Sequence, residues 1–233
     1  MVMNDLKISA DAIIGEDAYI GKYAEIAARA FIGAGAYIGD RTRVGPGAII
    51  SPRVRVNSDV WIMDNATLDA GVFINSSAAI GEGAQIGEGV VIGEDAFIGA
   101  NVIIGTYTKI GAGAFIEGDV CIGSDARIGV NTRVGAFTKI GPGVVIGAYT
   151  RIKNCADIRT AADYIDAGTD TRQNLFLAHR LATGAWVYRL GCKSFSSAES
   201  ARAYYGESGN ADVQECLRKI QFIENEIRGR EHE

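Results

Sequence analysis

Arginine and aromatic residues recur at a spacing of 18 residues in one part of the sequence. Tyr37, Arg55 and Phe73 form one such series, and Arg43 and Trp61 form another. A guanidinium group offers a planar fork of N–H donors for phosphate or carboxylate, and an aromatic ring offers a flat face for a base or another ring. If positions 18 apart are neighbours in space, these residues predict a binding site for a small anionic ligand.

A repeat of six residues would make such positions neighbours. From Ile8 to Ile158, every sixth position is Ile, Val or Leu, and from Ile14 onward a small or β-branched residue lies two positions before each one. This period fits a coil of short strands joined by tight turns, with both positions pointing inward. The position three residues after each inward Ile is rich in Gly, Asn and Asp, which tolerate a positive φ at a turn.

These repeats resemble the hexapeptide-repeat family, whose fold is a left-handed parallel β-helix with three hexads in each triangular coil. The resemblance covers roughly residues 8–158, and it implies that residues 18 apart stack at about the ordinary strand spacing of 4.8 Å. It also implies a homotrimer with ligand or active sites in grooves between subunits. We therefore expect an all-β solenoid at 1–158 and a small C-terminal α+β or helical appendage at 159–233 that caps the coil or supports oligomerisation.

The candidate site lies where the repeat loses its glycines. The residue after each inward Ile is usually Gly, but in VNSDVWIMDNATLDAGVFINSS this slot holds Asn, Met or Asp. The inward positions of this segment keep the pattern, so only residues outside the core differ. The predicted ligand-binding residues are Tyr37, Arg43, Arg53, Arg55, Asn57, Asp59, Trp61, Asn65, Phe73 and Asn75. The alternative for this segment is a purely structural role, in which stacked amides and Arg–aromatic contacts stabilise the solenoid and its interfaces.

The repeat contains no histidine. Most acyltransferases of the family that the repeat resembles use a histidine of the coil as general base, and the carbonic-anhydrase branch needs three to hold its metal. The sequence has two histidines, His179 and His232, and both follow the repeat. We therefore predict a non-catalytic binding protein without catalytic residues, metal or cofactor. One alternative is an atypical acyltransferase that uses Asp59, Asp64 or Asp69 as base and acetyl-CoA as donor. The other is a purely structural or assembly protein whose C-terminal segment binds a protein partner.

The residue before each inward position should point outward and be polar in a monomer. Three columns of such positions, each with a spacing of 18 residues or a multiple of it, carry large apolar side chains instead. Repeated apolar surface indicates an interface, so self-association as a homotrimer is expected. The columns are Ile13, Phe31, Ile49 and Ile103; Tyr19, Tyr37, Phe73 and Val91; and Trp61, Phe97 and Phe115. The cations Arg127, Arg133, Lys139 and Arg151 are expected to be solvated or to pair between subunits.

Composition excludes several classes of protein. The net charge of −5 gives no global attraction to nucleic acid or to a membrane surface, and no apolar run approaches a membrane span. The four cysteines are widely spaced and lack a CxxC pair, which argues against a disulfide or zinc framework. The first residues lack the apolar run of a signal peptide, and a cytoplasmic location is expected.

The repeat ends after Ile158. We expect a connection with an Ala-rich helical stretch in the segment RTAADYIDAGTDTRQ. We expect two short strands around a turn at Thr183-Gly184 in the segment FLAHRLATGAWVYRLGCKSFS, with Trp186 and Tyr188 on one face. SSAESARAYYG predicts a helix with Ser196 or Ser197 as N-cap and Gly206 as its stop. The final segment predicts a helix whose apolar stripe is formed by Val213, Cys216, Leu217, Ile220, Ile223 and Ile227.

Part of this segment, WVYRLGCKSFSSAESARAYYG, resembles a tail module that follows hexapeptide repeats in bacteriophage-encoded proteins. The matching residues are Leu190, Gly191, Cys192, Phe195, Ser196 and Tyr204. The resemblance implies a phage origin, and it favours a nucleotide-like host immune signal as the molecule that a binding protein would sequester.

Overall fold

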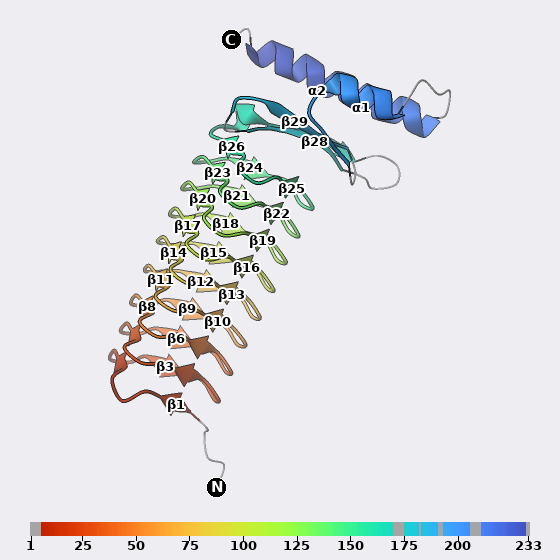
Figure 1. Ribbon diagram of the computed structural model, residues 1–233. Helices are drawn as coiled ribbons and strands as arrows, with labels where there is room; N and C mark the ends of the chain where they lie inside the picture. Colours follow the sequence, from red (N-terminus) through yellow and green to blue (C-terminus); the bar gives the residue numbers. More distant parts are fainter. Residues whose placement is uncertain (1–5, 170–174, 182, 191–192, 206–210, 232–233) are drawn as a thin grey trace. The chain divides into compact units, whose positions relative to one another are not determined.

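The computed structural model describes residues 6–169, 175–181, 183–190, 193–205 and 211–231. The chain forms two compact units, Met1–Asn154 and Cys155–Glu233 (Figure 1). The first unit is a parallel β-helix, and the second is a small antiparallel sheet with helices.

The β-helix consists of three parallel sheets, which we call A, B and C. Each strand has two residues, and the strands of one coil belong to A, B and C in turn. Sheet A contains β1 (Lys7–Ile8), β4 (Glu25–Ile26), β7 (Arg43–Val44), β10 (Trp61–Ile62), β13 (Ala79–Ile80), β16 (Phe97–Ile98), β19 (Phe115–Ile116), β22 (Arg133–Val134) and β25 (Arg151–Ile152). Within the first unit, sheet B contains β2 (Ile13–Ile14), β5 (Phe31–Ile32), β8 (Ile49–Ile50), β11 (Thr67–Leu68), β14 (Gln85–Ile86), β17 (Ile103–Ile104), β20 (Cys121–Ile122) and β23 (Lys139–Ile140). Sheet C contains β3 (Tyr19–Ile20), β6 (Tyr37–Ile38), β9 (Arg55–Val56), β12 (Phe73–Ile74), β15 (Val91–Ile92), β18 (Lys109–Ile110), β21 (Arg127–Ile128) and β24 (Val145–Ile146).

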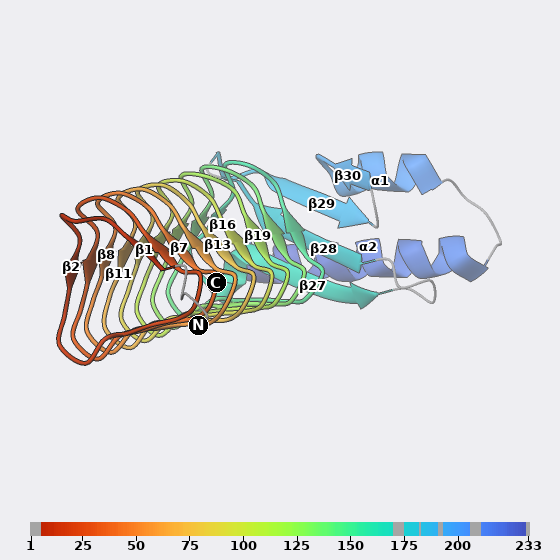
Figure 2. The ribbon, with the colours of Figure 1, turned by 90° about the horizontal axis from the view of Figure 1, so that it is seen from below.

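Residues 18 apart are neighbours in every sheet, as the repeat predicts. Trp61, for example, pairs with Arg43 on one side and with Ala79 on the other. Figure 2 shows the successive coils from below, one behind the other. Since the first residue of each strand points outward and the second inward, each outer face carries columns of side chains from successive coils.

The inward positions form the core of the β-helix. From Ile26 onward the second strand residue is almost fully buried, and so is the small residue two positions before it. Threonine at the latter position is tolerated because its hydroxyl is hydrogen-bonded: Thr42 Oγ1 donates to the carbonyl of Asn57 over 2.9 Å, and Thr108 Oγ1 donates likewise to Gly123. The polar atom is therefore satisfied in the core.

The corners of the coil explain both the turn residues and the frequent glycine. Every sixth residue from Asp17 to Cys155 has a positive φ, as predicted for the position three after each inward residue. At the slot directly after the inward residue, a Cβ would meet the backbone of the next coil: at Gly81 it would lie 2.4 Å from the carbonyl carbon of Gly99. The glycine-poor segment places side chains in this crowded slot, and Asn75 there donates its amide to the carbonyl of Ile92 over 2.9 Å.

The second unit begins with β26 (Asp157–Ile158) and a 3₁₀ turn, Ala161–Asp163, and continues as an antiparallel sheet. Its strands, in order, are β27 (Tyr164–Thr169), β28 (Leu175–Arg180), β29 (Trp186–Leu190) and β30 (Lys193–Phe195). The predicted helical connection is therefore wrong over 164–169, which forms β27. The sequence predicted two strands, whereas the observed sheet has four. Pairing of Tyr164 and Ile165 with β28 overrides the high helix propensity of the neighbouring alanines, because intrinsic propensity yields to tertiary context.

The predicted hairpin and both predicted helices are present. Strands β28 and β29 pair around the turn at Thr183-Gly184, and Trp186 packs against the same core that contains Tyr188. Helix α1 (Ala198–Tyr205) starts at Ser197, whose Oγ accepts a hydrogen bond from the N–H of Ser200 over 3.1 Å. The predicted stop at Gly206 lies outside the described residues.

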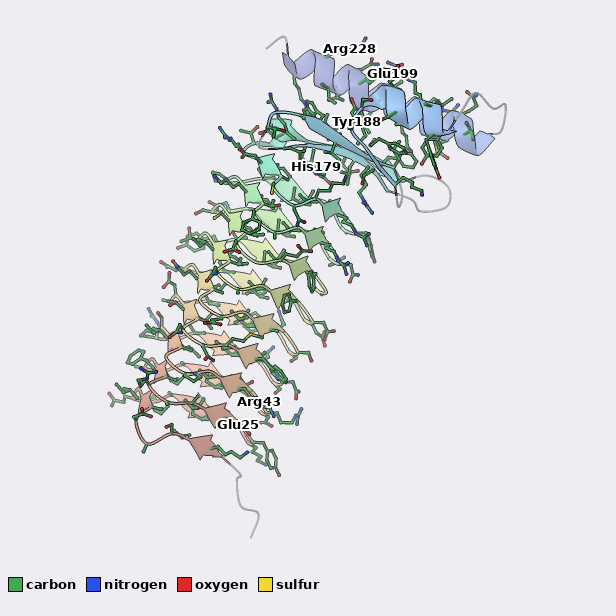
Figure 3. All side chains as sticks on the ribbon, in the orientation of Figure 1. Glu25, Arg43, His179, Tyr188, Glu199 and Arg228 are labelled. Carbon is green, nitrogen blue, oxygen red and sulfur yellow. The ribbon has the colours of Figure 1, made fainter. Side chains whose placement is uncertain are left out.

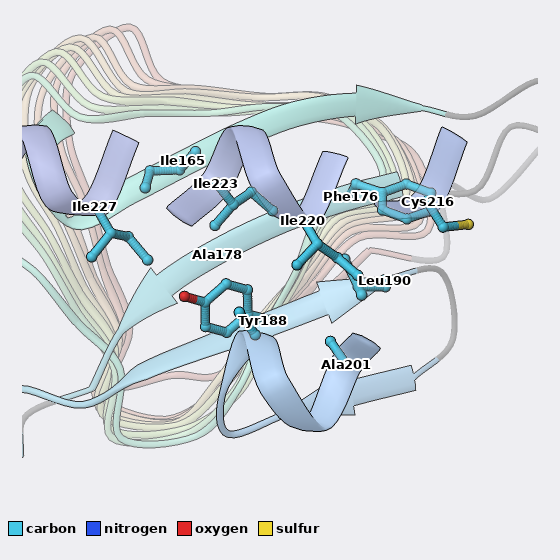
Figure 4. Close-up of a cluster of buried hydrophobic side chains, with 11 residues drawn as sticks. Ile165, Phe176, Ala178, Tyr188, Leu190, Ala201, Cys216, Ile220, Ile223 and Ile227 are labelled. Carbon is cyan, nitrogen blue, oxygen red and sulfur yellow. The ribbon is translucent and has the colours of Figure 1, made fainter. Parts of the chain in front are cut away.

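The long helix α2 (Ala211–Glu231) completes the core of the second unit. Four residues of its predicted stripe are buried against the sheet (Figure 4). The four are Cys216, Ile220, Ile223 and Ile227. Leu217 is half-buried and packs against the same core. None of the helices in the described part of the chain is long and apolar enough to cross a membrane.

Candidate functional site

A groove of about 590 Å³ crosses the outer face of sheet A at β1, β4, β7 and β10. Its outward column is Lys7, Glu25, Arg43 and Trp61, which the strand register places in sequence. Asp64, in the turn after β10, lines the groove beside Gly45. The arrangement follows directly from the 18-residue spacing, because each coil adds one outward side chain to the face.

Arg43 links the charged and aromatic parts of this groove. Its Cζ lies 5.0 Å from the centroid of the Trp61 ring, which confirms the predicted Arg–aromatic stack. Its Nε lies 3.4 Å from Oε2 of Glu25, and Glu25 also accepts a 2.8 Å hydrogen bond from Lys7 Nζ. Figure 3 shows Glu25 and Arg43 next to one another on neighbouring strands. The side chain of Arg43 is 55% exposed and Trp61 is 50% exposed, so the guanidinium and the indole are both accessible to a ligand.

Glu25 makes the chemistry of the groove mixed rather than purely basic. The hydrogen bond and charge of Lys7, together with the charge of Arg43, lower the pKa of Glu25 below its usual value. This carboxylate is therefore ionised near neutral pH and occupies part of the donor capacity of both cations. The groove offers N–H donors to an anionic group and carboxylate acceptors, Glu25 and Asp64, to hydroxyl groups.

The second predicted stack lies on sheet C. The Cζ of Arg55 is 5.2 Å from the centroid of Tyr37 and 5.8 Å from that of Phe73, so both faces of the guanidinium are covered by rings. Tyr37 in turn stacks on Tyr19 with a centroid distance of 4.8 Å. Only the N–H donors in the plane of the Arg55 guanidinium remain for an acceptor, which suits a carboxylate or phosphate approaching edge-on.

The remaining predicted residues lie at the corners of the coil. Asn57, Asp59 and Asn75 are at the corner between sheets C and A, Arg53 is at the corner between B and C, and Asn65 is at the corner between A and B. Eight of the predicted residues therefore surround one corner, whereas Arg53 and Asn65 lie at the other two. Whether this set binds a ligand stays a prediction.

Asp59 is engaged by Arg41. Arg41 donates from Nε and Nη2 to the two carboxylate oxygens of Asp59 over 2.6 and 2.7 Å. The hydrogen bond from Arg41, reinforced by its charge, lowers the pKa of Asp59. A carboxylate with a lowered pKa and both oxygens bonded is a poor general base, so the structure disfavours Asp59 in that role.

The other two predicted bases lie on different faces. Asp64 lines the groove on sheet A, whereas Asp69 lines a smaller pocket of about 300 Å³ on sheet B. His179 is fully buried in the second unit, and His232 is outside the described residues. Within the described ranges, no group of three or more His, Cys, Asp and Glu side chains is arranged to hold a metal ion.

Sequence reasoning missed Lys7 and Glu25 because it concentrated on the glycine-poor segment. Both belong to the series Lys7, Glu25, Arg43 and Trp61, whose spacing of 18 is visible in the sequence. Extending the column by two coils toward the N-terminus would have found them.

Comparison with known proteins identifies the class of the repeat. The family model described as bacterial transferase hexapeptide (six repeats) matches residues 59–94, 83–118 and 119–154. The repeat region therefore belongs to the hexapeptide-repeat family, as the sequence resemblance implied. No curated protein sequence matches the chain.

The similarity to solved structures concerns the fold. The UDP-N-acetylglucosamine O-acyltransferase of Moraxella catarrhalis matches with a TM-score of 0.63 and 18% identity, over 95% of this chain and 96% of that chain. The acyltransferase of Francisella novicida that is named for the same nucleotide sugar matches with a TM-score of 0.48 and 21% identity, over 78% and 71%. Its Arabidopsis counterpart matches with a TM-score of 0.46 and 13% identity, over 98% and 95%. The two lower scores support no further argument.

The protein thus has the fold of hexapeptide-repeat acyltransferases, and the predicted class, a left-handed parallel β-helix with a small C-terminal appendage, is confirmed. These comparisons leave the predicted phage origin untested.

Proposed function

We propose that the β-helix binds a small ligand that combines a phosphate group with a sugar or base ring, in the groove on sheet A. The observation that carries this proposal is the exposed Arg43–Trp61 stack inside a groove of about 590 Å³. The ring would lie against the indole of Trp61, the phosphate would accept from Arg43 and Lys7, and hydroxyl groups would donate to Glu25 or Asp64. The nucleotide sugar named for the Moraxella catarrhalis neighbour has all three groups, which makes UDP-N-acetylglucosamine a suitable probe.

The proposed role is binding without chemical conversion. The repeat has no histidine that could act as general base, and Asp59 is held by Arg41. A nucleotide-like ligand sequestered in this way would fit the class predicted from the sequence. Calorimetric titration of UDP-N-acetylglucosamine tests the proposal, since Arg43→Gln should weaken binding while circular dichroism stays unchanged.

Acyl transfer is the second candidate function, and the fold favours it more than it favours a non-catalytic protein. Asp64 is the carboxylate that would serve as base, because it lines the same groove as Trp61 and Arg43. The acyl donor would then be acetyl-CoA.

Mass spectrometry of UDP-N-acetylglucosamine incubated with acetyl-CoA and the protein separates the two functions. We expect the nucleotide sugar to remain unmodified, because the groove holds no histidine to remove a proton from an acceptor hydroxyl. An acetylated product that disappears in Asp64→Asn and persists in Asp69→Asn would establish the transferase instead. Asp69 is the matched control because its carboxylate lies on another face of the coil.

We also propose that the subunits associate through the apolar outer column of sheet B as a homotrimer. On sheet B the outward residues Ile13, Phe31 and Ile49 are 61, 37 and 46% exposed and follow one another in register. Burying such a column in an interface removes apolar surface from water.

Ile49→Asp should convert the assembly to monomers, because a carboxylate in this apolar column would be buried in the interface without a partner. Sedimentation equilibrium measures the mass of both forms. A wild-type protein that sediments as a single chain of 24.6 kDa contradicts the proposed trimer.

A further inference from the structure

A second set of arginine and aromatic side chains occupies the other end of sheet A. The outward column there is Phe97, Phe115, Arg133 and Arg151, in consecutive register. The two phenylalanine rings stack with a centroid distance of 4.7 Å and an interplanar angle of 14°, and the Cζ of Arg133 lies 5.2 Å from the centroid of Phe115. Like the first groove, this column joins guanidinium groups to flat apolar faces.

The two arginines differ from Arg43 in having no carboxylate partner. Arg133 and Arg151 are exposed, and across the described ranges neither forms an ion pair. The nearby carboxylate of Glu117 accepts a 3.0 Å hydrogen bond from the backbone N–H of Ala136. Like charges that face each other directly across neighbouring strands destabilise a sheet, so this pair costs stability in the absence of an anion.

We propose that Arg133 and Arg151 form a binding site for a phosphate monoester whose ring or apolar group lies against the outward edges of the Phe115 and Phe97 rings. Neighbouring strands are about 4.8 Å apart, which lets one phosphate accept from both guanidinium groups. Arg133 can lie over Phe115 and still present the N–H donors at the edge of its plane. The phosphate offsets the repulsion between the arginines, and the phenylalanine rings favour an ester over free phosphate.

This site is separate from the groove around Trp61. Arg133 follows Trp61 by four coils of sheet A, which is roughly 19 Å at the ordinary strand spacing. A compact ligand at one site therefore leaves the other free. Sheet C carries a similar pair of cations, Lys109 and Arg127, but its neighbours in the column are Val91 and Val145, which offer no aromatic face.

Calorimetry at low ionic strength, with phenyl phosphate and inorganic phosphate as probes, tests the proposal on the full chain. Phenyl phosphate should bind saturably and more tightly than inorganic phosphate. Arg133→Gln and Arg151→Gln should each weaken phenyl phosphate binding about tenfold or more, since each removes charge-assisted hydrogen bonds. Phe115→Leu should reduce the preference for phenyl phosphate over inorganic phosphate.

Two control variants test whether binding depends on these two arginines or on the positive charge of the protein in general. Lys139→Gln removes one positive charge from sheet B and should leave the affinity unchanged, and so should Lys109→Gln, which removes one from sheet C. The proposal is overturned if neither phenyl phosphate nor inorganic phosphate binds. It is also overturned if the affinity of each probe is the same for the wild type and for Arg151→Gln. Binding that is lost in Trp61→Ala but kept in Arg151→Gln also overturns it, and would assign the phosphate to the first groove.

Discussion

Trp61→Ala is expected to weaken binding of UDP-N-acetylglucosamine about tenfold to a hundredfold while leaving the fold intact. Stacking of a base on an aromatic side chain contributes about 1–3 kcal/mol, and the indole of Trp61 is the aromatic ring that lines the groove. The loss should exceed that of a removed surface charge, because the stacked ring and its contact with Arg43 disappear together. Calorimetry gives the affinity, and circular dichroism reports the fold.

Phe222→Ala is the matched control for this substitution. Phe222 is also a half-exposed aromatic residue, at 47%, but it lies on α2 in the second unit. Its removal should leave the affinity unchanged. If the wild type and Trp61→Ala bind UDP-N-acetylglucosamine with equal affinity, the ligand does not bind in the groove on sheet A.

Leu68→Ala should lower the free energy of unfolding by about 2–5 kcal/mol. Leu68 is fully buried on β11, in the segment where the repeat lacks glycine, and truncation leaves a cavity between coils that pack tightly on both sides. A large effect here shows that the segment keeps the core of a regular coil although its outer residues differ. Denaturant unfolding at a fixed protein concentration measures it.

Gln85→Ala provides the comparison on the same sheet. Gln85 is exposed, points outward from β14 and pairs with Thr67, the residue that precedes Leu68. Its replacement should change the stability by no more than about 0.5 kcal/mol. If Leu68→Ala were as mild as Gln85→Ala, the coil in this segment would be loosely packed, and a rigid binding face there would be untenable.

The six-residue period determines most of the first unit. Once Ile8 and its successors are placed inward, every outer neighbour follows by counting 18 residues, which is why Arg55 could be placed between Tyr37 and Phe73 without a structure. The positive φ at the corners follows in the same way, even where the residue is as large as Tyr149. A strict repeat makes distant contacts as predictable as local ones.

The second unit was harder to predict because its contacts are not periodic. The strand at Tyr164 exists because it pairs with β28, and nothing within RTAADYIDAGT indicates that partner. The helix α2 could be predicted because its stripe, including Ile220 and Ile223, is a local pattern that tertiary burial then uses.

The candidate site was predictable in composition but not in charge balance. The spacing placed Arg43 beside Trp61, yet the partner of Arg43 depends on which way Glu25 and Lys7 extend over the face. The same limit applies to Arg133 and Arg151, which sequence reasoning treated as solvated or paired between subunits. Only the positions of the surrounding carboxylates distinguish a neutralised arginine from one available to an anion.

Tryptophan fluorescence of a Trp186→Phe variant tests the central proposal most directly. The sequence has two tryptophans, so this variant leaves Trp61 as the sole reporter, inside the groove itself. Titration with UDP-N-acetylglucosamine should quench the emission saturably, because the ring of the ligand stacks on the indole, and Arg43→Gln in the same background should shift the curve to higher concentration. Emission that stays constant up to millimolar ligand would contradict the proposed site.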